Sequence, residues 1–99
     1  MDDNAFVQWL KAATAKGHTV YSGDIEVKYR ISGCEVRALV NRLRCLGDPK
    51  LSRIGSDQGG YYWIGSAKHA QRTITHLRSR AREINKAARG IERAFGGRK

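Results

Sequence analysis

The chain has only one proline, two cysteines and few acidic side chains. Pro49 is the single proline, so long stretches remain free to form helices. On one helix Cys34 and Cys45 would lie about 16 Å apart, whereas a disulfide needs Cα atoms within about 7 Å. The sequence therefore predicts two free thiols in a reducing compartment.

Long apolar runs are also missing from the sequence. No segment approaches the roughly 18–20 apolar residues of a membrane span. The acidic start, Met1 to Asn4, is not followed by the apolar stretch of a secretory signal. We therefore expect no membrane association and a cytoplasmic location.

The sequence lacks the residue patterns that usually carry catalysis or metal binding. The cysteines and the three histidines do not have the spacing of zinc ligands. Gly55–Gly60 is not followed by the lysine and helix of a phosphate-binding loop. The few carboxylates are scattered along the chain, so we expect no enzyme, no metal and no cofactor.

Positive charge is what the chain has in excess. Its 99 residues include 19 Lys and Arg against 9 Asp and Glu, a net charge of +10, with a pI near 10.2. Residues 1–65 are nearly balanced, with nine basic and seven acidic side chains, whereas residues 66–99 have ten and two. A charge this large points to a polyanion as partner, either nucleic acid or an anionic membrane surface.

The first third of the chain contains one clear helix and one ambiguous segment. The helix is predicted from Asn4, as its N-cap, to Ala15, with Gly17 as its C-terminal cap. A minimal strand over 18–21 follows. Residues 22–31 fit either a helix or a strand, because apolar residues alternate there with polar ones.

The strongest helix signal lies between Ser32 and Leu46. Ser32 and Glu35 have the spacing of a capping box, and Gly47 and Pro49 end the helix. One face of this helix is apolar and is expected to be buried: Val36, Leu39, Val40 and Leu43.

The remainder of the chain predicts a hairpin and a long helix. Two β-prone runs, 51–54 and 61–64, flank the Gly-rich loop 55–60. Ser66 then caps a helix that runs from Ala67 to about Phe95.

The order helix, short strand, helix, capped helix, hairpin is that of a winged helix-turn-helix domain. Apolar residues stand seven, three and one positions before the capping serine, as in this motif, so we favour a helix over 23–30. We expect a mainly α (α+β) fold with a winged helix-turn-helix over 1–65 and a two-stranded wing. A long basic helix over 66–95 and a disordered tail, 96–99, complete the chain.

A more specific resemblance rests on the run from Ile31 to Arg44, followed by Gly47, Pro49 and Gly60-Tyr61-Tyr62-Trp63. This pattern resembles small winged-helix proteins encoded by bacteriophages and prophages. Leu77-Arg78-Ser79-Arg80 matches a further element of that group, so the resemblance covers about residues 18–84. The chain departs from the group at Arg30 and Glu26, where a glycine and a small residue are common. The resemblance implies DNA binding and little beyond it. We expect the chain to bind double-stranded DNA in the nucleoid of a bacterial host, in transcription regulation or as a replication accessory.

In a helix-turn-helix protein the exposed face of the second helix enters the major groove. Arginine can pair with guanine, asparagine with adenine, and alanine can contact a thymine methyl. The residues expected to read bases are Arg37, Ala38, Asn41 and Arg42. Those expected to contact the DNA backbone are Lys28, Arg30, Ser32, Arg44, Lys50 and Arg53. The alternative is an ordinary solvated face, which every surface helix has.

Small and apolar residues recur at coiled-coil spacing along the last helix, from Ala70 to Phe95. A helix of about 28 residues is about 42 Å long, more than the preceding domain can cover. We therefore expect a homodimer, parallel or antiparallel, that presents two recognition helices to two half-sites. Its interface residues would be Leu77, Ala81, Ile84, Ala88, Ile91 and Phe95. Basic residues on the other faces could instead hold phosphates: Arg72, Arg78, Arg82, Lys86, Arg89 and Arg93.

A second class of function stays open beside DNA binding. A phage-encoded interaction protein or inhibitor could use the same basic surface to bind a host protein or nucleoprotein complex. A membrane-surface helix is disfavoured, because the seam is narrow and rich in alanine where a membrane face would be broad and bulky.

Overall fold

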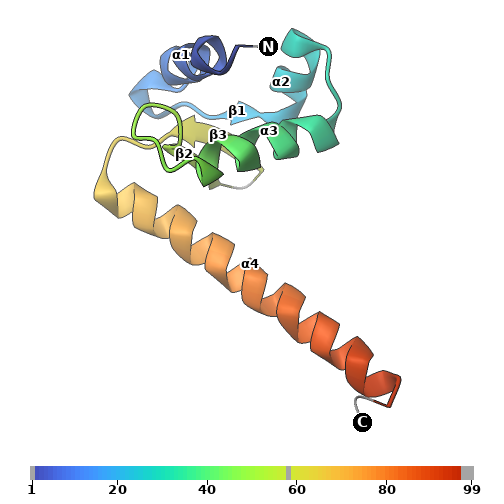
Figure 1. The fold of residues 1–99 in the computed structure, drawn as a ribbon. Coiled ribbons are helices and arrows are strands. Elements are labelled where there is room, and N and C mark those ends of the chain that lie inside the picture. The colour runs from blue at the N-terminus through green and yellow to red at the C-terminus, as the bar shows by residue number, and fades with distance from the viewer. Residues whose placement is uncertain (1, 58, 97–99) are drawn as a thin grey trace.

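The computed structural model describes residues 2–57 and 59–96. It has helices α1 (Asp3–Ala13), α2 (Ser22–Tyr29), α3 (Gly33–Cys45) and α4 (Ala67–Ala94), and a 3-10 turn η1 (Ala15–Gly17). The strands are β1 (Val20–Tyr21), β2 (Ile54–Asp57) and β3 (Gly60–Trp63). The protein is thus mostly helical with a small sheet, which confirms the expected α+β class (Figure 1). Of the expected disordered tail, residues 97–99 lie outside the described part of the chain.

The three strands form one antiparallel sheet in the order β1-β3-β2. The hairpin is confirmed, but its strands extend into the segment predicted as a loop, 55–60. Glycine permits this because the strands pack closely there. A Cβ on Gly55 would lie 2.5 Å from Cζ of Tyr62, and one on Gly60 would overlap the methyl group of Thr19.

The predicted strand over 51–54 begins only at Ile54. The residues before it form a turn that is closed by one side chain, the hydroxyl of Ser52. This hydroxyl donates a hydrogen bond to the carbonyl oxygen of Leu43 (2.6 Å) and accepts one from the backbone N–H of Asp48 (2.8 Å). The turn is therefore tied to the end of α3 through Ser52, and only Arg53 continues the hairpin, by accepting a hydrogen bond from the N–H of Ile64 (2.8 Å).

The core lies between the sheet and helices α1, α2 and α3. It contains the four predicted apolar residues of α3 and the α1 side chains of Phe6, Val7 and Leu10. Trp9 and Tyr29 close its edge, with the Phe6 and Tyr29 ring centroids 5.8 Å apart in an edge-on arrangement.

Helix α1 begins earlier and ends earlier than predicted. Its N-cap is Asp2, whose carboxylate accepts a hydrogen bond from the N–H of Asn4 (3.3 Å), so the prediction of Asn4 as cap was wrong. At the other end the hydroxyl of Thr14 donates to the carbonyl of Leu10 (2.8 Å) and accepts from the N–H of Trp63 (3.1 Å). This link to β3 is a tertiary contact, which sequence periodicity does not reveal.

The ambiguous segment 22–31 is helical, as the motif order favoured. Ile25 is buried, whereas Val27 is 82% exposed, so the strand-like alternation is not used for burial. The helix ends at Arg30, which adopts a left-handed conformation with φ of 56°. This is the position where the resembling group commonly has glycine, the residue that adopts such a backbone without steric cost.

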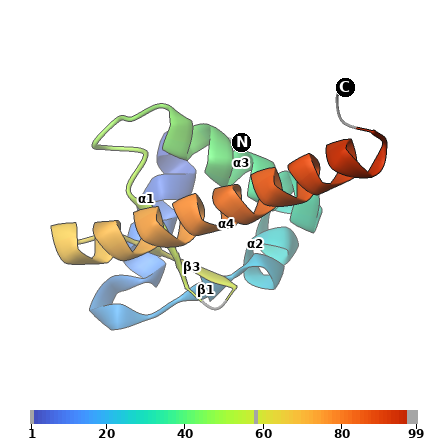
Figure 2. The same ribbon diagram turned by 90° about the horizontal axis from the view of Figure 1, so that it is seen from below.

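Helix α4 leaves the sheet after its N-cap Ser66, runs unbroken through Gly90 and projects beyond the domain (Figure 1). Seen from below, it crosses the sheet and continues past α3 (Figure 2). Thr73, at 4% exposure, is its only buried residue. The molecule is accordingly elongated, with extents of 53 × 32 × 23 Å. Within the described residues, none of the helices combines the length and the apolar character needed to cross a membrane.

Candidate nucleic-acid interface

Helix α3 has a well-defined start and one buried face. The Ser32 hydroxyl accepts a hydrogen bond from the N–H of Glu35 (3.2 Å), and the Glu35 carboxylate accepts one from the N–H of Ser32 (3.1 Å). This confirms the predicted capping box. Because the apolar stripe faces the core, the opposite face is exposed to solvent, with these side chains: Cys34, Arg37, Ala38, Asn41, Arg42 and Cys45.

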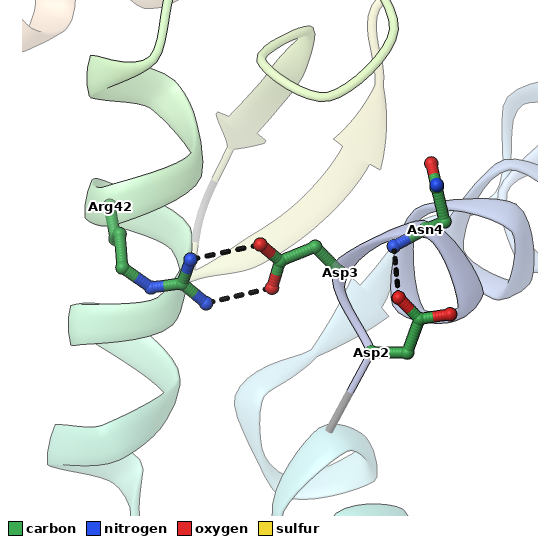
Figure 3. A network of polar contacts seen from close by, with 4 residues as sticks. All are labelled: Asp2, Asp3, Asn4 and Arg42. Atoms are coloured by element: carbon green, nitrogen blue, oxygen red, sulfur yellow. Dashed lines mark hydrogen bonds and ion pairs between the residues drawn. The ribbon is translucent and has the colours of Figure 1, made fainter.

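Arg42 is held by an ion pair at the N-terminus of α1 (Figure 3). Its two terminal nitrogens donate to the two carboxylate oxygens of Asp3 at 2.8 and 2.9 Å. The hydrogen bond from Arg42 lowers the pKa of Asp3, which keeps the carboxylate ionised. Arg42 therefore lies on the α1 side of α3, and Asp3 competes with any outside ligand for its guanidinium.

Arg44 is directed into the domain. Its Nε donates to the carbonyl oxygen of Ile54 (2.9 Å) and one Nη to the hydroxyl of Ser56 (3.1 Å). The side chain is half-buried, and loss of solvent lowers the pKa of its guanidinium. Arg44 thus joins α3 to β2, and its polar atoms are not directed outward as a phosphate contact would require.

The other residues predicted to contact the DNA backbone lie on two sides of α3. Lys28 extends over the rings of Trp9 and Tyr29, with its Nζ 5.4 Å from each centroid. Arg30 and Ser32 flank the turn between α2 and α3, and the hydroxyl of Ser32 is used by the helix cap.

Lys50 and Arg53 lie in the connection between α3 and β2, and both are exposed. The backbone N–H of Lys50 donates to the carboxylate of Asp48 (2.8 Å), which orders the turn. Arg53 borders a shallow hollow that also contains Ala70 and Ile74 of α4. The two cations therefore lie at the opposite end of α3 from Lys28 and Arg30.

An open groove of about 770 Å³ separates α3 and the hairpin from α4. From α3 it is lined by three of the four predicted base-reading residues, Arg37, Ala38 and Asn41, together with Val40 and Arg44. Arg42, the fourth, is not among the lining residues. The α4 side of the groove carries the predicted dimer residues Leu77, Ala81 and Ile84, beside Arg80.

Sequence reasoning did not anticipate that the α4 seam and the exposed face of α3 share this groove. The available signal was Thr73, whose hydroxyl accepts a hydrogen bond from the N–H of Ser56 (3.4 Å) and fixes α4 on β2. Leu77, Arg80 and Ile84 follow Thr73 at helical spacing and so share its side of α4. The sequence alone does not show that Thr73 is buried, because its partner Ser56 is 17 positions away.

Most of the predicted dimer seam is exposed in the part of the chain that the structure describes. Ile84 and Ile91 are each 64% exposed, and Phe95 is 88% exposed. Ala81 and Ala88 lie between them and are exposed as well. The structure thus leaves the whole set from Leu77 to Phe95 open to another molecule.

Comparison of the chain with protein families, with curated proteins and with solved structures gives no match. Within residues 2–57 and 59–96, no group of three or more His, Cys, Asp or Glu side chains is arranged to hold a metal ion. The features that bear on function are therefore the exposed face of α3, the hairpin and the charge of the chain.

Proposed function

We propose that the chain is a winged helix-turn-helix protein that binds double-stranded DNA. The observation that carries the proposal is α3, a capped helix with one face buried and Arg37, Ala38 and Asn41 together on the other. An exposed helix of this length fits the major groove, where these three side-chain types have matching base edges.

The surrounding architecture supports this assignment. Helices α2 and α3 follow one another across a turn of three residues, as in a helix-turn-helix unit. The β2–β3 hairpin is linked to α3 by the hydrogen bonds of Arg44. In the proposed complex the hairpin lies along the DNA backbone as the wing.

The net charge of +10 supplies the attraction that any such complex needs. We assign phosphate contacts to Lys28, Arg30, Lys50 and Arg53, which are exposed or directed outward around α3. Binding should weaken steeply with added salt, since counterions are released from each neutralised phosphate.

The decisive experiment selects preferred sites from a random DNA library and then compares two variants that lose the same charge. Arg37→Ala removes a proposed base contact, and Arg89→Ala removes a cation of α4 that is remote from α3. We expect Arg37→Ala to cost about 1–3 kcal/mol at the preferred site and to relax the preference at one base pair. Arg89→Ala should weaken all sequences alike; an equal effect of the two variants would reject α3 as the reading helix.

With DNA as its ligand, the protein would act in the bacterial nucleoid, as a phage-type regulator or replication accessory. One observation favours the second function class, a host-protein interaction. Beside its polar and charged residues the groove is lined by the apolar side chains of Val40, Leu77 and Ala81, which suit a protein helix better than a phosphate backbone. An occupant of this chemistry is identified below.

A further inference from the structure

Helix α4 presents an apolar seam that the domain covers only at its start. Ala70 and Ile74 lie against the α3–β2 connection, and Thr73 is buried on β2. Ile74 and Leu77 are each 38% exposed, and exposure rises along the seam to 64% at Ile84 and Ile91 and 88% at Phe95, at the end of the helix. The part of the seam that is most open to a partner therefore lies between Leu77 and Phe95.

The seam alternates small and large residues in a way that depends on helix direction. Parallel packing would place Ala81 against Ala81 and Ala88 against Ala88 of a second copy, leaving gaps. Antiparallel packing centred on residue 86 places Ala81 against Ile91, Ala88 against Ile84, and Leu77 against Phe95. Each alanine then faces a large side chain, so the antiparallel pair fills space better.

Charges beside the seam favour the same arrangement. On the flank of α4 that faces away from α3, Arg78, Asn85 and Glu92 recur every seven residues. Antiparallel pairing about residue 86 brings Arg78 next to Glu92 of the second copy, twice per dimer, and Asn85 next to Asn85. Parallel pairing sets this flank against the other one, which has Arg80, Ala87 and Ala94 and offers no opposite charge to Arg78.

The groove beside α3 accommodates the end of the second helix. In this register residues 88–95 of the second copy lie along Leu77, Ala81 and Ile84, which line the groove. Phe95 of the second copy then reaches the level of Leu77, which lines the same groove as Val40 and Tyr61. The flank that approaches α3 carries only small residues near this point, Ala87 and Ala94.

We infer that α4 pairs with α4 of a second copy of this chain, antiparallel, with residue 86 near the twofold axis and Phe95 seated in the groove beside α3. This pairing does not depend on DNA. The seam is thereby assigned to self-association. The two helices run in opposite directions, a point that the residue spacing alone leaves open.

The direction and register can be measured with spin labels at three exposed positions of equivalent orientation, Ser79, Lys86 and Arg93. Each is changed singly to cysteine in a full-length Cys34→Ser, Cys45→Ser background. Across the proposed dimer the axial separation is near zero at 86 and about 21 Å at both 79 and 93, at 1.5 Å per residue. We expect a short distance at 86 and two longer, equal distances at 79 and 93.

Three results would overturn the inference. Equal distances at all three positions would indicate a parallel pair. Equal distances at 79 and 86 with a longer one at 93 would indicate a register shifted toward the domain. A monomer by sedimentation at the labelling concentration, with helix content unchanged, would show that the seam has another partner, such as a host protein.

A charge exchange tests the flanking contact independently. Arg78→Glu should raise the dimer dissociation constant about fivefold relative to Arg82→Glu, which changes net charge equally, because two exposed ion pairs are lost. Adding Glu92→Arg to Arg78→Glu should restore wild-type affinity. Failure of the double variant to recover would reject the Arg78–Glu92 contact.

The two proposals fail in distinguishable ways. The sedimentation and spin-label measurements contain no DNA, so they are unaffected if α3 does not bind DNA. Added salt should tighten the dimer, because it screens repulsion between two strongly basic helices, whereas it should weaken a DNA complex.

Discussion

Arg37, Arg42 and Arg44 all lie on α3, but their side chains have different surroundings. Arg37 borders the groove, Arg42 is paired with Asp3, and Arg44 is bonded to β2. Only Arg37 combines exposure with a position on the face of α3 beside Asn41. Arg42 and Arg44 have partners within the protein, and we expect different consequences when the partner or the arginine is removed.

Asp3 should act as a competitor of DNA. Asp3→Asn removes the carboxylate that binds both terminal nitrogens of Arg42, so we expect DNA affinity to rise several-fold. Fluorescence anisotropy with a selected site measures this change. Arg42→Ala in the Asp3→Asn background is the control and should abolish the gain; a gain that persists would mean that Arg42 does not contact DNA.

The same ion pair gives a pH dependence to stability. The pKa of Asp3 is lowered in the folded protein, so its contribution is present above the unfolded pKa, about 4. The contribution is lost as pH falls through the folded pKa. Urea unfolding should therefore show a smaller acid-induced loss of stability for Asp3→Asn than for wild type, and identical pH profiles would contradict this role.

Arg44 should matter for stability more than for DNA affinity. Arg44→Ala leaves the carbonyl of Ile54 and the hydroxyl of Ser56 without this donor, and hydrogen bonds to charged groups are worth about 1.5–3 kcal/mol. We expect the melting temperature to fall by roughly 4–8 °C per kcal/mol in a domain of this size. Arg37→Ala is the matched control and should change the melting temperature little.

At the scale of elements, the junction between α2 and α3 combines a favourable helix cap with a residue in an unfavourable backbone conformation. Ser32 and Glu35 satisfy the start of α3, whereas Arg30 holds a left-handed backbone at the end of α2. A non-glycine residue in this region pays about 1–2 kcal/mol. The presence of arginine where strain could be relieved suggests that its charge serves binding.

Arg30→Gly tests whether the arginine contributes to binding at the expense of stability. We expect it to raise the free energy of unfolding by about 0.5–1 kcal/mol, because glycine adopts the left-handed region without steric cost. DNA affinity should fall at the same time. Arg30→Ala should lose the affinity without gaining the stability, and a stability gain from alanine equal to that from glycine would show that backbone strain is not the cause.

For the whole molecule, the two proposals together would couple self-association to DNA binding through the shared groove. In the proposed antiparallel pair the second copy of α4 would cover the flank of α3 that holds Arg37 and Asn41, whereas the dimer expected from the sequence presents two open recognition helices. DNA and the second copy should compete for this flank, and the monomer should be the form that reads bases.

The competition can be observed by sedimentation with a short duplex that carries one selected site. We expect one protomer per duplex and a dimer fraction that falls as duplex is added. Ile84→Asn, which disrupts the seam without changing the charge, should bind this duplex at least as tightly as wild type. A complex of two protomers that retains the spin-label distances of the free dimer would contradict the competition.

Much of the fold was predictable because its signals are local. The Ser32–Glu35 capping box, the buried stripe of α3 and the extent of α4 each depend on residues within one helix, and the structure confirms all three. The Asn4 cap was wrong because Asp2 has the same capping ability two residues earlier. The extended hairpin was missed because glycine, which weakens strands in general, is needed here for the close approach of Tyr62 and Thr19.

By itself the sequence determined where α3 and α4 begin and which face of α3 is apolar, since these depend on neighbours a few positions apart, and it determined the strong positive charge. Tertiary structure alone decided which cations are free and what shares the groove. Arg42 meets a carboxylate 39 positions away, and Arg44 meets a strand that begins ten positions later. Contacts at such separations are set by how the elements pack, and periodicity within one element carries no record of them.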